Sequence, residues 1–366
     1  MSGIRSGWFS RFLLPGLAFK AVIIGGGYAT GRELAEFFMP CGPWGGVVAI
    51  GVAGTFWSLI CVLTFLFARR FDGWDYRAFF KQLLGRFWVL FEIPYILLLI
   101  IILAVFGAAA GAIGQALFGW PTIAGTLSLV GLIALFTASG NVSVEALFKY
   151  VSILLYSVYA LFLVLALSSF GGKIAAAFSA PEVGGGWGTA GLTYAGYNLV
   201  GAVAILPVLR HLKSDRDAVA AGLFAGPLAI LPALMFFVCM AAWPEAQAAI
   251  LPSDFLLSRL DLPVFRWLFQ AMIFAALLES GSGSVHAVNQ RIAGMLGGEL
   301  SWMRRLASSL AILVGSVFLA DRFGLVQLIA SGYRLLSWAF LAVYALPLLT
   351  IGAWRLFKAP ISSPRR

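Results

Sequence analysis

The sequence predicts an all-α integral membrane protein with ten transmembrane helices arranged as two halves of five. The composition is 61% hydrophobic and only 11% charged, whereas soluble domains are about 45–50% apolar. Apolar runs long enough to cross a bilayer, about 18 residues or more, recur along the chain. Since each crossing needs about 20 residues, the 366 residues leave room for roughly ten crossings and little else.

Charge clusters and Pro/Gly turns divide the chain into these crossings. The first apolar stretch contains consecutive glycines followed by Arg32 and Glu33, so it is not a cleavable signal peptide. We expect the first half, residues 1–170, to hold spans at about 13–40, 44–69, 87–118, 122–139 and 145–170. A glycine-rich linker, 171–189, leads to the second half, 190–366, with spans at about 190–209, 217–242, 264–293, 303–320 and 325–354 and a short tail.

The distribution of Lys and Arg predicts the orientation. With the N-terminus inside, the outer segments hold only Lys173, Arg259, Arg266 and Arg322, and nearly all other basic residues fall on the inner side. Cytoplasmic loops are enriched in Lys and Arg. Both termini are therefore predicted to be cytoplasmic, in a plasma (inner) membrane, with the linker and a second long connection, 243–263, outside.

Several classes of partner are not expected. The three cysteines, Cys41, Cys61 and Cys239, are too few and too scattered for a disulfide framework or a metal site. The net charge of +10 comes from short clusters between spans, which membrane insertion explains without nucleic acid. We predict no cofactor, no metal and no nucleic-acid partner, and the oligomeric state is open.

The first span is interrupted near its middle. Gly25, Gly26 and Gly27 precede Tyr28, and Thr30 and Gly31 follow. Because glycine costs about 1 kcal/mol in a helix, this cluster predicts local unwinding, which membrane depth tolerates only beside a cavity or other protein. Close helix packing through small residues is the alternative.

The sixth span has a matching interruption. Two glycines and an amide lie at corresponding depth, with tyrosines beside them; the set is Tyr194, Gly196, Tyr197, Asn198 and Gly201. Broken spans that open two matching halves indicate an inverted repeat with the binding site between them. Half-helix N-termini suit an anionic group and free carbonyls suit a cation, so a small zwitterion is the predicted substrate.

The stretch GGGYATGRELAEFF, residues 25–38, resembles the first-helix motif of the YkvI-like amino acid permeases. Tyr197-Asn198 and the pattern ESGSGSVHAVNQRI, residues 279–292, also resemble that family. The family belongs to the amino acid, polyamine and organocation superfamily. The resemblance covers essentially the whole chain and implies the LeuT-type five-plus-five fold.

Two departures from the family concern the coupling ion. Arg32 stands where the family tends to have Gln, and Glu279-Ser280 replaces paired threonines in span eight. That span-eight position resembles the second sodium site of the fold. Glu279, with Ser280 and Ser282, is the predicted ion-coupling group, for H⁺ or Na⁺; a hydrogen-bonded packing role for Glu279 is the alternative.

Charged residues inside a membrane need a partner or water, because an unpaired one costs at least about 2.5–3.5 kcal/mol. Glu33 and Glu36 lie on the outer half of span one, and Arg334 lies on the outer half of span ten. An ion pair between these spans would close an external gate. A static pair that locks two helices, or a local pair of Arg32 with Glu33, is the alternative.

Side chains at the breaks complete the predicted binding site. Tyr28, Tyr194 and Tyr197 would wall the pocket, although packing is an equal alternative for each. In span three, Gly107, Gly111 and Gly114 recur at helical spacing and predict close packing with a neighbour.

Together these features predict an ion-coupled secondary transporter of a small zwitterion, most simply an amino acid, working by alternating access. No phosphate-binding GxxxxGK[ST] loop is present, and neither His211 nor His286 lies in an enzyme-like set, so enzyme activity is not predicted. A transition-metal carrier would need carboxylate, imidazole or thioether ligands at the breaks, but span one offers no Asp and span six no Met, Cys or His, so it is not predicted. A sensor that binds without transport, or a carrier of another small organic solute, fits the same site. The identity of the solute and the direction of transport are open.

Overall fold

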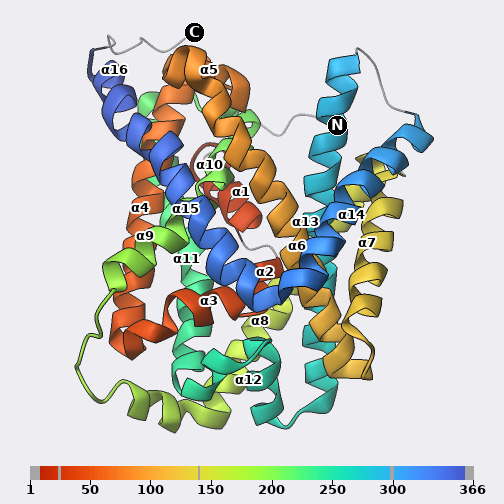
Figure 1. The fold of residues 1–366 in the computed structure, drawn as a ribbon. Helices are drawn as coiled ribbons and strands as arrows, with labels where there is room; N and C mark the ends of the chain where they lie inside the picture. The colour runs from red at the N-terminus through yellow and green to blue at the C-terminus, as the bar shows by residue number, and fades with distance from the viewer. Residues whose placement is uncertain (1–8, 24–25, 139–140, 297–300, 359–366) are drawn as a thin grey trace.

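The fold is a bundle of long helices (Figure 1). The structure is a computed structural model that describes residues 9–23, 26–138, 141–296 and 301–358. Within these residues, six helical stretches are long and apolar enough to cross a membrane, by length and composition. The predicted number of ten crossings therefore stays a prediction. Helix α5 (Tyr76–Leu84) lies at one end of the bundle and α12 (Pro252–Leu260) lies at the other. The two ends are called the α5 end and the α12 end below.

The first half of the chain follows the predicted spans closely. Its first span is interrupted at Thr30 and Gly31, and the others are long helices, of which α8 is kinked at Phe170. The elements are η1 (Phe9–Leu13), α1 (Leu14–Ile23), α2 (Gly26–Ala29), α3 (Arg32–Phe37), α4 (Gly42–Arg70), α6 (Val89–Phe118), α7 (Thr122–Ala138) and α8 (Asn141–Ala177). The short helices η2 (Met39–Cys41), α5 and η3 (Gly85–Trp88) connect them.

The second half repeats the pattern of one broken span followed by long helices. The elements are α9 (Trp187–Asn198), α10 (Val200–Ala204), η4 (Leu206–His211), α11 (Asp215–Ala241), η5 (Pro244–Ala248), α12, α13 (Pro263–Leu296) and α14 (Trp302–Gln327). α14 is kinked at Gly324, whose φ is +69°. After this kink the last span runs through η6 (Leu328–Tyr333), α15 (Arg334–Phe340), η7 (Leu341–Ala345) and η8 (Leu348–Gly352) to α16 (Ala353–Lys358).

The break in the first span falls at Thr30 and Gly31. Gly31 has a φ of +75°, which a side chain would strain, and a Cβ there would come within 2.6 Å of Phe236. The Ser253 N–H donates to the Thr30 carbonyl at 3.0 Å, so α12 satisfies a backbone group that the helix leaves free. Gly26 and Gly27 lie in α2, and Gly25 is outside the described residues.

The break in the sixth span is milder than predicted. α9 ends at Asn198, α10 begins at Val200, and the intervening Leu199 keeps a near-helical conformation. The Asn198 amide donates to the Tyr194 carbonyl at 3.1 Å, within the preceding turn. The span then narrows into the 3-10 helix η4.

Small residues let the long helices approach closely. Gly222 and Gly226 of α11 lie against the backbone of α4 near Val62 and Gly54. In α6, Gly107 and Gly111 pack against Thr126 of α7, and the Thr126 hydroxyl donates to the Gly107 carbonyl at 2.8 Å. The predicted packing role of the span-three glycines is thus confirmed.

Ion pairs tie the elements together at the α5 end. Arg11 donates to both carboxylate oxygens of Asp217, at 2.8 and 2.7 Å. Asp217 also closes the capping box of α11 with Ser214. Arg69 and Arg70 of α4 both bind Asp215 at the first turn of α11, where a carboxylate also suits the helix dipole. The start of α11 is therefore fixed to both η1 and α4.

Candidate functional site

The broken first span places a carboxylate inside the bundle. Glu33 belongs to the first turn of α3, directly after the Gly31 turn, and is only 5% exposed. Its Oε2 accepts a hydrogen bond of 2.7 Å from the hydroxyl of Tyr197, on α9. The two predicted broken spans therefore meet through this pair of side chains.

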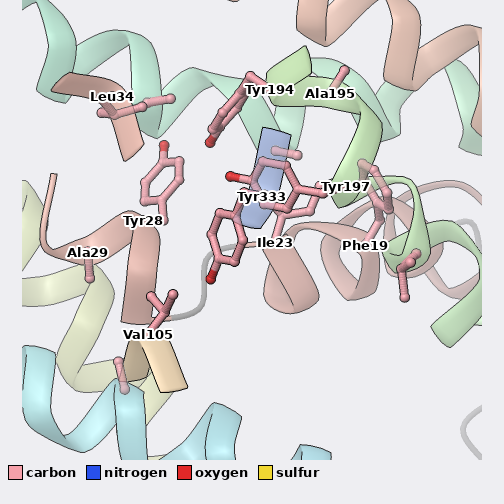
Figure 2. Close-up of a cluster of buried hydrophobic side chains, with 14 of the residues drawn as sticks. Phe19, Ile23, Tyr28, Ala29, Leu34, Val105, Tyr194, Ala195, Tyr197 and Tyr333 are labelled. Atoms are coloured by element: carbon pink, nitrogen blue, oxygen red, sulfur yellow. The ribbon is translucent and has the colours of Figure 1, made fainter. Parts of the chain in front are cut away.

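Tyrosine side chains surround this pair. Tyr28 of α2, Tyr194 and Tyr197 of α9, and Tyr333 of η6 gather in one buried cluster (Figure 2). The rings of Tyr197 and Tyr333 stack with centroids 4.4 Å apart, and those of Tyr194 and Tyr197 meet edge to face at 5.9 Å. The hydroxyls of Tyr28, Tyr194 and Tyr333 are buried and find no hydrogen-bond partner among the described residues. These hydroxyls can donate hydrogen bonds to, or accept them from, a solute or water molecule that enters the cluster.

An arginine–glutamate network closes the cluster towards the α12 end. Glu36 accepts from Arg32 at 3.2 Å and from Arg334 at 3.4 Å. The Arg32 guanidinium also donates to the carbonyls of Gln247 and Ala249, at 2.7 and 2.9 Å. The predicted contact between the first and last spans is thus made by Glu36 and Arg334. Glu33 points to Tyr197 instead and takes no part in it.

A cavity of about 260 Å³ lies beside this network. Its lining includes Glu36 and Arg334 together with Phe37, Cys41 and Thr193. The Phe37 ring separates the cavity from the tyrosines, since its centroid lies 5.7 Å from that of Tyr194 and 6.1 Å from that of Tyr197. The Arg334 guanidinium lies over the outer side of this ring, 5.9 Å from its centroid.

The predicted ion-coupling residues lie on α13, which packs against α2. Glu279 and Ser280 are half-buried. Ser282 is fully buried, and its hydroxyl has no hydrogen-bond partner within the described part of the chain. Span eight therefore packs against the piece of span one that precedes its break, and the coupling role of these residues stays a prediction.

Two of the predicted binding glycines are packing positions in this conformation. A Cβ on Gly196 would meet Ser337 of α15 at 2.9 Å, and one on Gly201 would meet Phe19 of α1 at 3.1 Å. Ser337 fixes the same contact through a hydrogen bond of 2.5 Å to the Thr193 carbonyl. Thr30 is buried, and its side-chain oxygen accepts from the Arg32 N–H at 3.3 Å.

Sequence reasoning missed two tyrosines of this region. Tyr333 completes the buried cluster, and Tyr159 of α8 donates to the Ala29 carbonyl at 3.4 Å. Tyr159 and Tyr28 also line a second, apolar cavity of about 220 Å³, together with Phe162 and Phe236. In a chain that is 14% aromatic, Tyr159 does not stand out in the sequence. Tyr333 could have been noticed only because it is next to the predicted gate residue Arg334.

Comparison with known proteins confirms the predicted fold. No family model matches the chain. It is 22% identical over 351 residues to the uncharacterized membrane protein YkvI of Bacillus subtilis (strain 168), covering 94% of this chain and 96% of that protein. The chain is thus similar to YkvI, as its first-helix motif indicated.

Solved structures of other proteins share the architecture. MhsT in complex with L-phenylalanine superimposes with a TM-score of 0.63 at 17% identity, covering 96% of this chain and 97% of MhsT. A Na⁺-coupled sialic acid symporter does so with a TM-score of 0.61 at 13% identity, covering 92% and 78%. The chain is an integral membrane protein with the LeuT-type fold. The relatives named here are membrane proteins and transporters rather than enzymes.

Proposed function

We propose that this LeuT-type protein is an ion-coupled secondary transporter of a small zwitterionic solute, most simply an amino acid. The observation that carries the proposal is the meeting of Glu33 and Tyr197, from the two broken spans, in a closed cluster of buried tyrosines. The fold relatives solved with L-phenylalanine and with sialic acid support a small organic solute.

In this proposal the solute binds between the broken spans. Backbone groups around Gly25–Gly31 and Gly196–Gly201 contact its charged ends, and Tyr28, Tyr194, Tyr197 and Asn198 contribute side chains. Glu279, Ser280 and Ser282 of α13 are the candidates for coupling to H⁺ or Na⁺. The Na⁺ coupling of the sialic acid symporter supports an ion-coupled mechanism on this fold.

We propose that the α12 end faces the outside of an inner membrane and that this conformation is closed there. Arg32, Glu36 and Arg334 form the closure, and Phe37 seals the tyrosine cluster beneath it. Alternating access requires that this network open and close, because a gate that never opens cannot pass a solute.

The deciding experiment is uptake into proteoliposomes. Purified protein is reconstituted, and a panel of labelled amino acids is offered under an imposed pH gradient or an imposed Na⁺ gradient. Accumulation under one gradient supports the proposal and identifies the ion. Loss of accumulation in Glu279→Gln, but not in the exposed control Glu182→Gln, would assign coupling to Glu279.

Absence of transport has a separate meaning. If no amino acid moves under either gradient, the amino acid transporter is ruled out. Saturable binding of an amino acid without transport would then identify a sensor, and transport of other solutes would identify a different carrier.

A further inference from the structure

The most buried carboxylate beside the broken first span is that of Glu33. It is 5% exposed, and the described residues give it one hydrogen-bond partner, the Tyr197 hydroxyl at 2.7 Å. Tyr197 is itself only 3% exposed. A charged carboxylate in such a place is costly unless a cation or several hydrogen bonds compensate it.

The neighbouring arginines do not supply that cation. Arg32, the next residue in α3, directs its guanidinium to Gln247, Ala249 and Glu36. Arg334 binds Glu36 as well. Both cations are therefore engaged on the cavity side of α3, and among the described residues neither forms an ion pair with Glu33.

The groups that face Glu33 from the surrounding elements are phenols. α2 contributes Tyr28, α9 contributes Tyr194 and Tyr197, and η6 contributes Tyr333. On the side of α8, Tyr159 donates to the Ala29 carbonyl. From the α12 end, η5 presents carbonyls to Arg32, and α12 presents the Ser253 N–H to Thr30.

We propose that Glu33 is the group that takes up and releases the coupling proton, which names H⁺ as the ion of the transporter proposed above. The inference rests on that proposed function and assigns the coupling step to Glu33 rather than to Glu279. The proton adds to one carboxylate oxygen, while the other keeps the hydrogen bond from Tyr197. The new O–H has acceptors at hand, because phenolic oxygens accept as well as donate.

The surrounding structure controls when the proton can enter. The cavity reaches Phe37 and Glu36 but stops at the Phe37 ring, which Arg334 covers. Since Glu33 and Glu36 share the short helix α3, a movement of α3 that breaks the Glu36 ion pairs also shifts Glu33 towards the cavity. Water in the opened cavity donates the proton, and water on the opposite side accepts it after the cluster reopens there.

Protonation of Glu33 is measured directly by infrared difference spectroscopy of the reconstituted protein during a pH titration. We expect a protonated-carboxyl stretching band that disappears in Glu33→Gln, remains in Glu182→Gln, and shifts in frequency in Tyr197→Phe. A titration without any carboxyl band assignable to Glu33 would overturn the proposal. Elution of each variant as a single monodisperse species shows that it has folded.

Coupling is measured in proteoliposomes with the same panel of labelled amino acids. In Glu33→Gln, accumulation under a pH gradient should fall to the level of protein-free liposomes. Counterflow, in which labelled and unlabelled amino acid exchange without a gradient, should persist because glutamine mimics the protonated side chain. Retained accumulation in Glu33→Gln would contradict the assignment. If wild type shows no counterflow, the transporter proposal fails, and the infrared titration alone decides whether Glu33 binds a proton.

Discussion

Gly31 illustrates what one residue contributes to the site. Its positive φ turns the chain between α2 and α3, and its hydrogen atom faces Phe236. That turn directs Arg32 and Glu36 towards the cavity and leaves Glu33 with Tyr197. A helix that continued through this position would rotate all three side chains together.

Substitution of Gly31 by alanine should therefore destabilise the protein. The left-handed conformation costs a side chain roughly 1–2 kcal/mol, and displacement of Phe236 adds to this, so we expect a loss of about 2–3 kcal/mol in detergent. Thermal unfolding of the purified variant measures it. Gly51→Ala is the control: Gly51 lies in α4 with open space around it, and alanine should stabilise the helix there by about 0.5–1 kcal/mol. Equal midpoints for the two variants would contradict this account.

Residue roles could be predicted from the sequence only in part. The sequence showed that Glu33, Glu36 and Arg334 needed partners, but the choice of partner depends on the rotation of α3 after the Gly31 turn. The sequence also could not distinguish the buried Tyr159 and Tyr333 from the many aromatic residues that face lipid, because both kinds occur in the same apolar spans.

Among the elements, α3 connects the ion pairs of Glu36 with the tyrosine cluster around Glu33. It is a six-residue helix held by Arg32 to the η5 loop and by Glu36 to α15. These polar contacts fix the position of a short helix only weakly, because an exposed ion pair contributes only about 0.2–1 kcal/mol to stability. Arg334 is half-exposed, so its pair with Glu36 belongs to this weak class.

Glu36→Gln should consequently favour opening at the α12 end. Cys41 is buried but borders the cavity, so it can report opening in a background that lacks Cys61 and Cys239. Loss of about 1 kcal/mol of ion pairing should increase the rate of maleimide labelling roughly fivefold. The exposed carboxylate Asp321 provides the control Asp321→Asn, which should leave the rate unchanged. An unaltered rate in Glu36→Gln would show that these pairs do not hold the gate.

The positions of the elements were predictable because lipid enforces long apolar runs. Each expected span coincides with a helix or a broken helix, and the predicted end at 170 falls on the kink at Phe170, after which a further helical piece runs to Ala177. The position of the first break was less predictable. Of the three consecutive glycines, Gly26 and Gly27 lie in α2, and Gly25 is outside the described residues. The turn comes instead at Thr30 and Gly31, because contacts with Phe236 and with α12 stabilise it there.

At the scale of the whole molecule, the outer surface is that of a membrane protein. Large apolar side chains such as Leu97, Leu135, Val164 and Phe318 are exposed on several helices, and lipid is the environment in which such a surface is stable. Composition alone predicted this. The division into residues 1–170, 171–189 and 190–366 stays a prediction, as does the number of crossings.

Orientation is the prediction that belongs to this scale. Lys20 is buried in α1 and so does not lie in an inner loop. Arg69, Arg70 and Lys213 do lie together at the α5 end, which is therefore predicted to face the cytoplasm. A fluorescent protein fused after Arg366 should therefore fluoresce in the cytoplasm, and alkaline phosphatase fused after Glu182 should be active outside. The reverse pattern of activities would place the α12 end in the cytoplasm.

The bidentate contact between Arg11 and Asp217 attaches the first span to α11, independently of the contacts that Arg32 makes with Gln247 and Ala249. Arg11 lies in η1 and Arg32 lies in α3, so the two contacts attach different halves of the broken span, on either side of the Gly31 turn. Arg11 binds the start of α11, whereas Arg32 binds the carbonyls of Gln247 and Ala249. Substitution of one arginine is therefore expected to weaken the attachment of its own half of the span and to leave the contacts of the other half in place.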